Sequence, residues 1–153
     1  MQNRVKLRTL GIATFAALFI GTAAYATDPM KIDVYRDANC GCCKKWVQYL
    51  KDSGLTVVDH VEMDMSSTKQ KFGVPPRLSS CHTAVINGKF VEGHVPVEQI
   101  FTISNRDDLM GIAAPGMPAG SPGMEVGGKR DAYQIIGLTK TGIDEVIMDY
   151  PAI

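Results

Sequence analysis

The sequence predicts an α/β protein in which a mixed β-sheet carries flanking helices and ends in a β-hairpin. Apolar and polar residues alternate in two segments, 31–37 and 55–63, as they do in half-buried strands. Between these segments apolar residues recur every three or four positions, which is the spacing of one helix face. Asn87-Gly88 is a strong signal for a two-residue hairpin turn. Strands that alternate with a helix and are followed by a hairpin indicate a mixed sheet.

The first 26 residues have the three-part pattern of a secretory signal peptide. Three basic residues are followed by an uncharged apolar run at 10–20 and by the small-residue sequence Ala24-Tyr25-Ala26. The apolar run is shorter than the roughly 20 residues of a membrane span, so we expect cleavage after Ala26 rather than a retained anchor. The prediction is an exported protein in which residues 27–153 form a single domain without membrane contact.

The first part of this domain alternates strands and helices. After the strand at 31–37, apolar spacing predicts a helix from Cys42 to Ser53, and Gly54 is a suitable C-terminal stop. The segment 55–63 is rich in β-branched residues and predicts a second strand. Residues 66–73 predict a short helix with a serine N-cap and a closing glycine.

The second part predicts more sheet. A proline-bounded loop at 74–82 leads into a hairpin at 83–93, and a helix follows from Val97 to about Ile103. Residues 131–150 predict a final hairpin that turns near Thr141-Gly142.

The order strand, helix, strand, helix, strand, strand, helix is that of a thioredoxin-like layer, in which a helix after the first strand carries cysteines at its N-terminus. Residues 111–130 depart from a minimal layer of this kind, with six glycines, three prolines and two methionines. They show no helical or strand period, so a twenty-residue loop is predicted. Loops of that length in compact domains are usually disordered or functional.

The charge balance excludes one class of function. Loss of the leader removes three of the sixteen basic residues and leaves sixteen acidic ones. Without a basic stripe the chain is not expected to bind nucleic acid. Export into an oxidising compartment allows the four cysteines to form two disulfides, and a stapled binding domain is therefore one alternative.

Three of the cysteines lie together in the sequence CGCC, as Cys40, Cys42 and Cys43. Cys40 and Cys43 have the spacing of a redox dithiol at a helix N-terminus, where unpaired backbone N–H groups and the helix dipole stabilise a thiolate. A thiol–disulfide oxidoreductase with Cys40 as nucleophile and Cys43 as resolving thiol is a second alternative.

Cys42 and Cys81 favour a metal site over an exchange site. Neighbouring helical residues point about 100° apart, so Cys42 and Cys43 suit several sulfur-bridged ions better than one tetrahedral zinc. In a thioredoxin-like fold the loop before the third core strand lies against the dithiol, and Cys81 is expected to join the other three thiols there. That loop ends in Cys81-His82, where exchange proteins ordinarily carry a proline.

The remaining candidate ligands are soft or borderline donors. Thiolates and thioethers select Cu(I), and Met117 and Met124 from the glycine- and proline-rich loop are predicted to cover the cluster. His94 and His82 can each add an imidazole, whereas His60 alternates along a strand and is predicted to lie at the surface. Packing remains the alternative role for the methionines, because methionine commonly fills cores.

The motifs CGCCKKW, SSCHTAVI, VEGHVP and PGMPAGSPGME, in this order, resemble those of exported bacterial copper-resistance proteins of the CopG type. The resemblance covers nearly all of residues 27–153. Members of that family are thioredoxin-like, lack a working thioredoxin motif and are associated with several copper ions bridged by cysteines. The resemblance implies a periplasmic protein in which Cys40, Cys42, Cys43 and Cys81 bridge copper, with His94 and the Gly-Pro-Met loop as accessory ligands.

The sequence therefore predicts a periplasmic copper-resistance protein that binds several copper ions, with Cu(I) favoured, through four cysteine thiolates. Sequestration is the predicted function. Interconversion of Cu(I) and Cu(II), and transfer to other periplasmic copper-resistance proteins, are compatible with the residues. No catalytic residue or organic cofactor is indicated.

Overall fold

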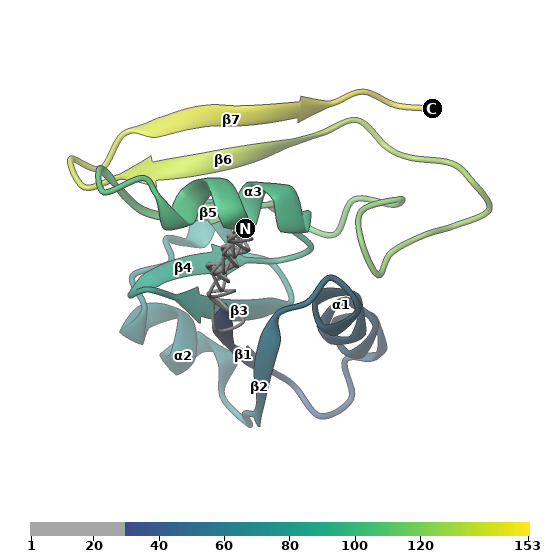
Figure 1. Cartoon of the computed structure of the whole chain (residues 1–153), viewed down its shortest axis with the longest axis horizontal. Coiled ribbons are helices and arrows are strands. Elements are labelled where there is room, and N and C mark those ends of the chain that lie inside the picture. Colours follow the sequence, from purple (N-terminus) through teal and green to yellow (C-terminus); the bar gives the residue numbers. More distant parts are fainter. Residues whose placement is uncertain (1–29) are drawn as a thin grey trace, which may run out of the picture.

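The computed structural model describes residues 30–153, and the predicted leader lies outside the described residues. A seven-stranded mixed sheet has the strand order β2-β1-β3-β4-β5-β6-β7 (Figure 1). Its strands are β1 (Lys31–Arg36), β2 (Thr56–Val61), β3 (His82–Ile86), β4 (Lys89–Glu92), β5 (Leu109–Ala113), β6 (Tyr133–Thr139) and β7 (Asp144–Tyr150). The helices are α1 (Gly41–Asp52), α2 (Met65–Lys71), the short 3-10 turn η1 (Pro76–Leu78) and α3 (Val97–Ser104).

The predicted α/β class, with its mixed sheet, flanking helices and final hairpin, is confirmed, and the elements from β1 to α3, apart from the short turn η1, follow the predicted order. Within residues 30–153, no helix has both the length and the apolar character that a membrane span requires.

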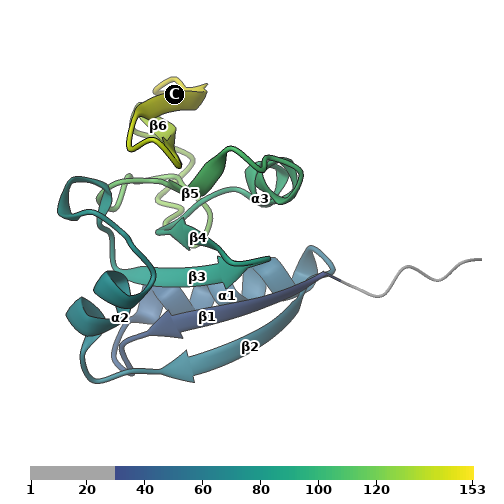
Figure 2. The ribbon, with the colours of Figure 1, turned by 90° about the vertical axis from the view of Figure 1, so that its left-hand side faces the viewer.

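The helices cover both faces of the sheet. Figure 2 shows α1 and α2 on opposite sides of β1 and β3. The larger core lies under α1 and α3, where Trp46, Leu50 and Ile100 are fully buried against β1, β3, β4 and β5. A smaller core on the other face joins Phe90 to Val74 and Leu78, which follow α2. Because both faces of the sheet are covered, β3 and β4 are buried along nearly their whole length.

Hydrogen bonds from α1 fix its position against the chain around α3. The indole Nε1 of Trp46 donates to the carbonyl of Val95 at 2.9 Å. The Tyr49 hydroxyl accepts from the backbone N–H of Val97 at 2.9 Å, at the start of α3. Pro96 is the N-cap of α3 and its side chain makes no capping hydrogen bond, so Tyr49 satisfies one of the free N–H groups there. The helix that carries the CGCC cysteines is therefore held rigidly at its middle.

Two local predictions are wrong. Residues 109–113 form β5, although residues 111–130 were expected to be loop throughout. Gly111 pairs with Phe90 across parallel strands, and a Cβ at Gly111 would overlap the Phe90 ring. Packing against that ring therefore requires glycine here, and glycine is not a residue typical of strands, so the sequence does not show the strand. At α2 the N-cap is Asp64 rather than a serine, because its carboxylate accepts from two backbone N–H groups at 3.0 and 3.1 Å.

The sheet topology brings four separated segments to one edge. Arg36 at the end of β1 pairs with His82 at the start of antiparallel β3. Thr83 pairs with Glu92 at the end of β4, and Glu92 pairs in parallel with Ala113 at the end of β5. Four segments therefore begin or end at this edge: the CGCC segment, the loop with Cys81, the residues after β4 and the loop after β5.

We expect Gly111→Ala to lower the free energy of unfolding by about 1–3 kcal/mol, because its methyl group must displace a buried ring. Gly137→Ala in β6 is the matched control, since its Cβ would approach Ile147 Cδ1 at 2.8 Å, the movable end of a side chain. Urea unfolding of both variants measures the difference. Equal losses would show that β5 does not pack on Phe90 as described.

Candidate metal centre

The four cysteine sulfur atoms lie together, all within 4.8 Å of one another. Cys40 is the N-cap of α1, and its Sγ accepts from the backbone N–H of Cys43 at 3.3 Å. The Cys42 sulfur lies 3.6 Å from that of Cys40. Cys81 approaches from the loop before β3, so the predicted meeting of this distant cysteine with the CGCC segment is confirmed.

Two of these cysteines form a disulfide in the structure. Cys40 is bonded to Cys43, and their Cα atoms are 5.3 Å apart, within the usual range for disulfides. Cys42 and Cys81 are free and half-buried. The helix start therefore accommodates the closed bond, and a site that uses all four sulfurs as thiolates requires its reduction.

Cys81 contacts two imidazoles as well as the other thiols. Its Sγ lies 3.2 Å from His82 Nδ1 and 3.2 Å from His94 Nε2. Burial, followed by the nearby Cys42 sulfur, raises the pKa of Cys81 to about 11. Without a metal ion this thiol therefore keeps its proton at neutral pH, and a soft metal ion must displace that proton to bind.

His94 is held in one orientation by the loop after β5. Its Nδ1 lies 2.8 Å from the Pro122 carbonyl oxygen, which can only accept, so Nδ1 carries the ring proton. Burial lowers the pKa of His94, which keeps the imidazole neutral. Nε2 then presents its lone pair toward Cys81. Metal-binding histidines are usually held in this way, with the N–H of the other ring nitrogen donating to a carbonyl or carboxylate group.

His82 is fully buried at the start of β3. Its ring lies 4.4 Å from the Trp46 ring and 4.9 Å, edge-on, from the His94 ring, measured between centroids. Burial lowers its pKa well below the usual value, and Nε2 has no hydrogen-bond partner in the structure. The sequence indicates His82 as a possible imidazole donor, although the family resemblance implies only His94 as an accessory ligand. Its position next to Cys81 was the available signal.

A buried carboxylate fixes the loop that carries Cys81. Glu92 is fully buried and accepts from the Ser80 backbone N–H at 2.6 Å and the Thr83 hydroxyl at 2.6 Å. The Lys69 ammonium group on α2 lies 2.5 Å from the same carboxylate. Ser80 and Thr83 flank Cys81 and His82, so these hydrogen bonds fix the position of the backbone that carries both candidate ligands. No sequence motif indicated this network.

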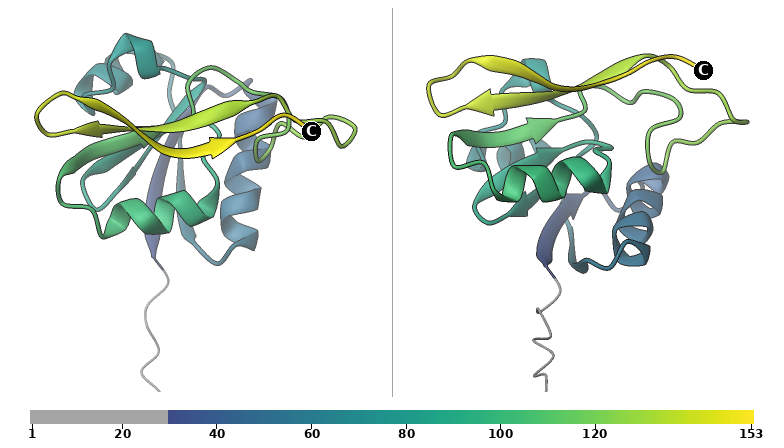
Figure 3. Two further views of the ribbon diagram at one scale, coloured as in Figure 1. Left: turned by 90° about the horizontal axis from the view of Figure 1, so that it is seen from above. Right: turned by 45° about the horizontal axis from the view of Figure 1, so that its top comes forward.

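The loop between β5 and β6 reaches the N-terminal end of α1 (Figure 3). Gly123 packs there through its backbone, because a Cβ would lie 2.8 Å from the backbone nitrogen of Trp46 and 3.1 Å from the carbonyl oxygen of Cys42. Met124 is half-buried next to it. Met117 is 57% exposed and lines a groove with Pro115 and Tyr133, a groove that none of the four cysteines lines. Copper binding by the two methionines stays a prediction.

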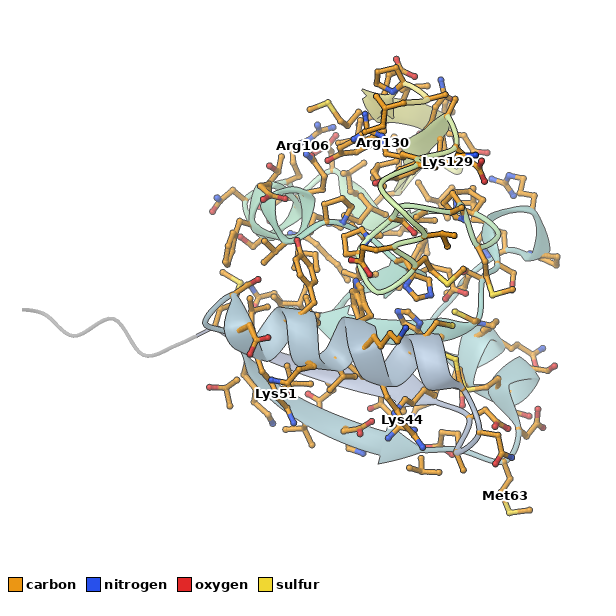
Figure 4. The ribbon with its side chains drawn as sticks, turned by 90° about the vertical axis from the view of Figure 1, so that its right-hand side faces the viewer. Lys44, Lys51, Met63, Arg106, Lys129 and Arg130 are labelled. Atoms are coloured by element: carbon orange, nitrogen blue, oxygen red, sulfur yellow. A yellow bond between two sulfur atoms is a disulfide. The ribbon has the colours of Figure 1, made fainter. Side chains whose placement is uncertain are left out.

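Lys44, Met63 and His60 do not belong to the group of donors around Cys81. Lys44 projects from α1 into solvent, and Met63 protrudes beyond β2 with its side chain fully exposed (Figure 4). His60 is bound to Asp33 at 2.8 Å on the strand β2, half-buried and separate from the thiols.

Two solved structures, both named copper resistance protein CopG, are similar to the chain. Form 2 is 57% identical, covers 81% of this chain and 100% of its own length, and superposes with a TM-score of 0.80. Form 1 is also 57% identical, covers 81% and 99%, and has a TM-score of 0.79.

The chain belongs to the CopG copper-resistance family. A family model described as a protein of unknown function, DUF411, matches residues 78–124, which run from the Cys81 loop to Met124. No curated protein sequence matches the chain.

For this CopG-family protein we expect Glu92→Gln to lower the free energy of unfolding by about 3–5 kcal/mol, because Lys69 is left without its buried counter-charge. The Cys81 loop should also loosen, so iodoacetamide should alkylate Cys81 faster relative to Cys42. Mass spectrometry of modified peptides measures that ratio.

Glu98→Gln is the matched control, since Glu98 is exposed on α3 and should change stability by less than about 1 kcal/mol. An unchanged ratio of Cys81 to Cys42 alkylation in Glu92→Gln would show that the carboxylate does not position the loop.

Proposed function

We propose that this protein binds several copper ions through Cys40, Cys42, Cys43 and Cys81 in the periplasm and thereby sequesters copper. The observation that supports this most directly is the convergence of four sulfur atoms within 4.8 Å of one another, in a chain of the copper-resistance family. Thiolates are soft ligands that select Cu(I), and each can bridge two ions.

The partly covered position of the sulfurs also supports this function. Cys43 is fully buried, while Cys42 and Cys81 are half-buried, so copper bound there would be shielded from most of the solvent and still reachable. His94 and the methionines Met117 and Met124 are the proposed accessory ligands. Interconversion of Cu(I) and Cu(II), and transfer to other periplasmic copper-resistance proteins, extend the same proposal.

Anaerobic titration of the reduced protein with Cu(I), against a chromophoric competitor, tests this function. We expect more than one Cu(I) per chain. Cys81→Ser should lose a large part of that uptake, because it removes the sulfur that faces the three helix-start thiols. Met63→Ser is the matched control for a sulfur residue outside the site. One copper or fewer per chain, or full uptake by Cys81→Ser, would refute the cluster.

A thiol–disulfide oxidoreductase is the second candidate, and one observation favours it. The Cys40–Cys43 disulfide is closed at the N-terminus of α1, where the helix dipole would stabilise an attacking thiolate after reduction. Cys42 counts against it, because a third sulfur 3.6 Å from Cys40 offers a competing partner for mixed disulfides.

Insulin reduction with dithiothreitol separates the two candidates. The copper-binding function predicts no turnover above the uncatalysed rate by the folded, metal-free protein. Catalysed turnover that disappears in Cys40→Ser would instead establish the oxidoreductase.

A further inference from the structure

We propose that a groove beside the C-terminal hairpin binds an extended peptide segment of a partner protein, one that carries both apolar and basic side chains. The groove lies between the loop at 115–118 and the open end of the β6–β7 hairpin, and its volume is about 1030 Å³. Figure 1 shows that loop and the open end of the hairpin on the same side of the molecule. No cysteine or histidine lines this hairpin groove, so it is distinct from the metal centre.

The wall of the hairpin groove is apolar and open to solvent. Met117 is 57% exposed, and Pro115, Pro118 and Ile136 add further apolar side chains. Val146 pairs with Ile136 across β6 and β7 and is 52% exposed, so the apolar surface continues from the groove onto β7. An exposed apolar surface with polar groups at its rim is typical of a protein interaction site.

The unpaired edge of β7 favours a peptide as the occupant. β7 is the last strand of the sheet, and its free backbone N–H and C=O groups can bond to an extended chain. Asp149 and Tyr150 of β7 line the groove, so a peptide in the groove lies beside this edge. The charged residues of β7 are all acidic, which discourages pairing between two copies of the strand but favours a basic segment.

Two carboxylates in the hairpin groove also favour basic side chains. Asp131 and Asp149 both line it, and within residues 30–153 neither forms a salt bridge. Asp131 accepts from the Ala119 backbone N–H at 3.1 Å and Asp149 from the Gln134 amide at 2.6 Å, so neutral donors hold both carboxylates in place. The neighbouring cation, Arg130, lies instead over a tyrosine ring, 5.7 Å from its centroid. Lysine or arginine side chains of a partner would supply the missing counter-charge.

The hairpin groove is preformed, which lowers the cost of binding. Pro115 and Pro118 restrict the backbone of one wall. The Asp131 N–H donates to the Ala119 carbonyl at 2.9 Å and ties that wall to the segment before β6. Little ordering is therefore needed when a peptide enters.

The loop that forms the groove also reaches the metal centre. It supplies the Pro122 carbonyl that orients His94, five residues after Met117. A partner bound in the hairpin groove would therefore contact the same loop that holds a candidate copper ligand.

Methionine methyl NMR of the metal-free, disulfide-bonded protein tests this surface. The probe is a capped Lys-Leu-Lys-Leu-Lys-Leu peptide, and Met117→Leu identifies the Met117 signal. We expect that signal to shift to saturation, while the signal of Met63, which is exposed but outside the groove, stays in place. Added salt should weaken the binding, because exposed charges are screened.

Matched peptides and variants separate the two contributions. A Glu-Leu peptide keeps the apolar side chains with the opposite charge, and a Lys-Ser peptide keeps the charge without the apolar side chains, so neither should saturate the Met117 shift. Asp131→Asn combined with Asp149→Asn should weaken binding of the Lys-Leu peptide by about fivefold or more, because the amides keep an acceptor oxygen but lose the charge. Asp52→Asn, at an exposed carboxylate on α1 outside the groove, is the matched control.

No saturable Met117 shift with the Lys-Leu peptide, equal binding of the Glu-Leu peptide, or unchanged affinity in the double variant would overturn the proposal. A Met117 signal that moves with protein concentration alone would assign the groove to a second copy of this chain and would overturn it as well. The sample holds no copper, so these outcomes are independent of the Cu(I) titration.

Discussion

The antiparallel pairing of β3 with both β1 and β4 is the constraint on which the metal centre depends. Arg36 opposite His82 brings the end of β1, and with it the CGCC segment, beside the start of β3. Thr83 opposite Glu92 brings the chain after β4, and with it His94, to the same place. A one-residue slip in either register would turn His82 to the opposite face of the sheet.

Burial makes that register costly to change. Trp46 packs on His82 from α1, and the Glu92 carboxylate binds residues on both sides of Cys81-His82 from beneath. A buried carboxylate is unfavourable unless it is paired and fully hydrogen-bonded, and here Lys69, Ser80 and Thr83 together meet that requirement. The fold thus places its least tolerant polar network directly behind the Cys81 loop, where movement would separate the thiol from its neighbours.

The sequence predicted those parts whose signal is local or topological. Helix α1, the hairpin at Asn87-Gly88 and the arrival of Cys81 followed from spacing, turn chemistry and element order. The strand β5 was missed because Gly111 is dictated by the Phe90 ring across the sheet, which no local pattern contains. The Pro122 contact with His94 is made by a backbone carbonyl, which any residue could supply. The role of Glu92 depends on partners from three other segments and has no spacing signature.

Cys81 belongs to two groups of donors, one with the three helix-start cysteines and one with His82 and His94, and this sharing couples them. While the Cys40–Cys43 bond is closed, Cys42 and Cys81 are the two free thiols of the group. If the bond is open, all four thiolates are available, and Cys81 can bridge Cu(I) ions together with the other three. The oxidation state of two cysteines thereby determines which donors surround Cys81. The closed Cys40–Cys43 bond and the 3.2 Å contacts of Cys81 with both histidines occur together in the structure, so the disulfide is compatible with this arrangement of Cys81 and the imidazoles.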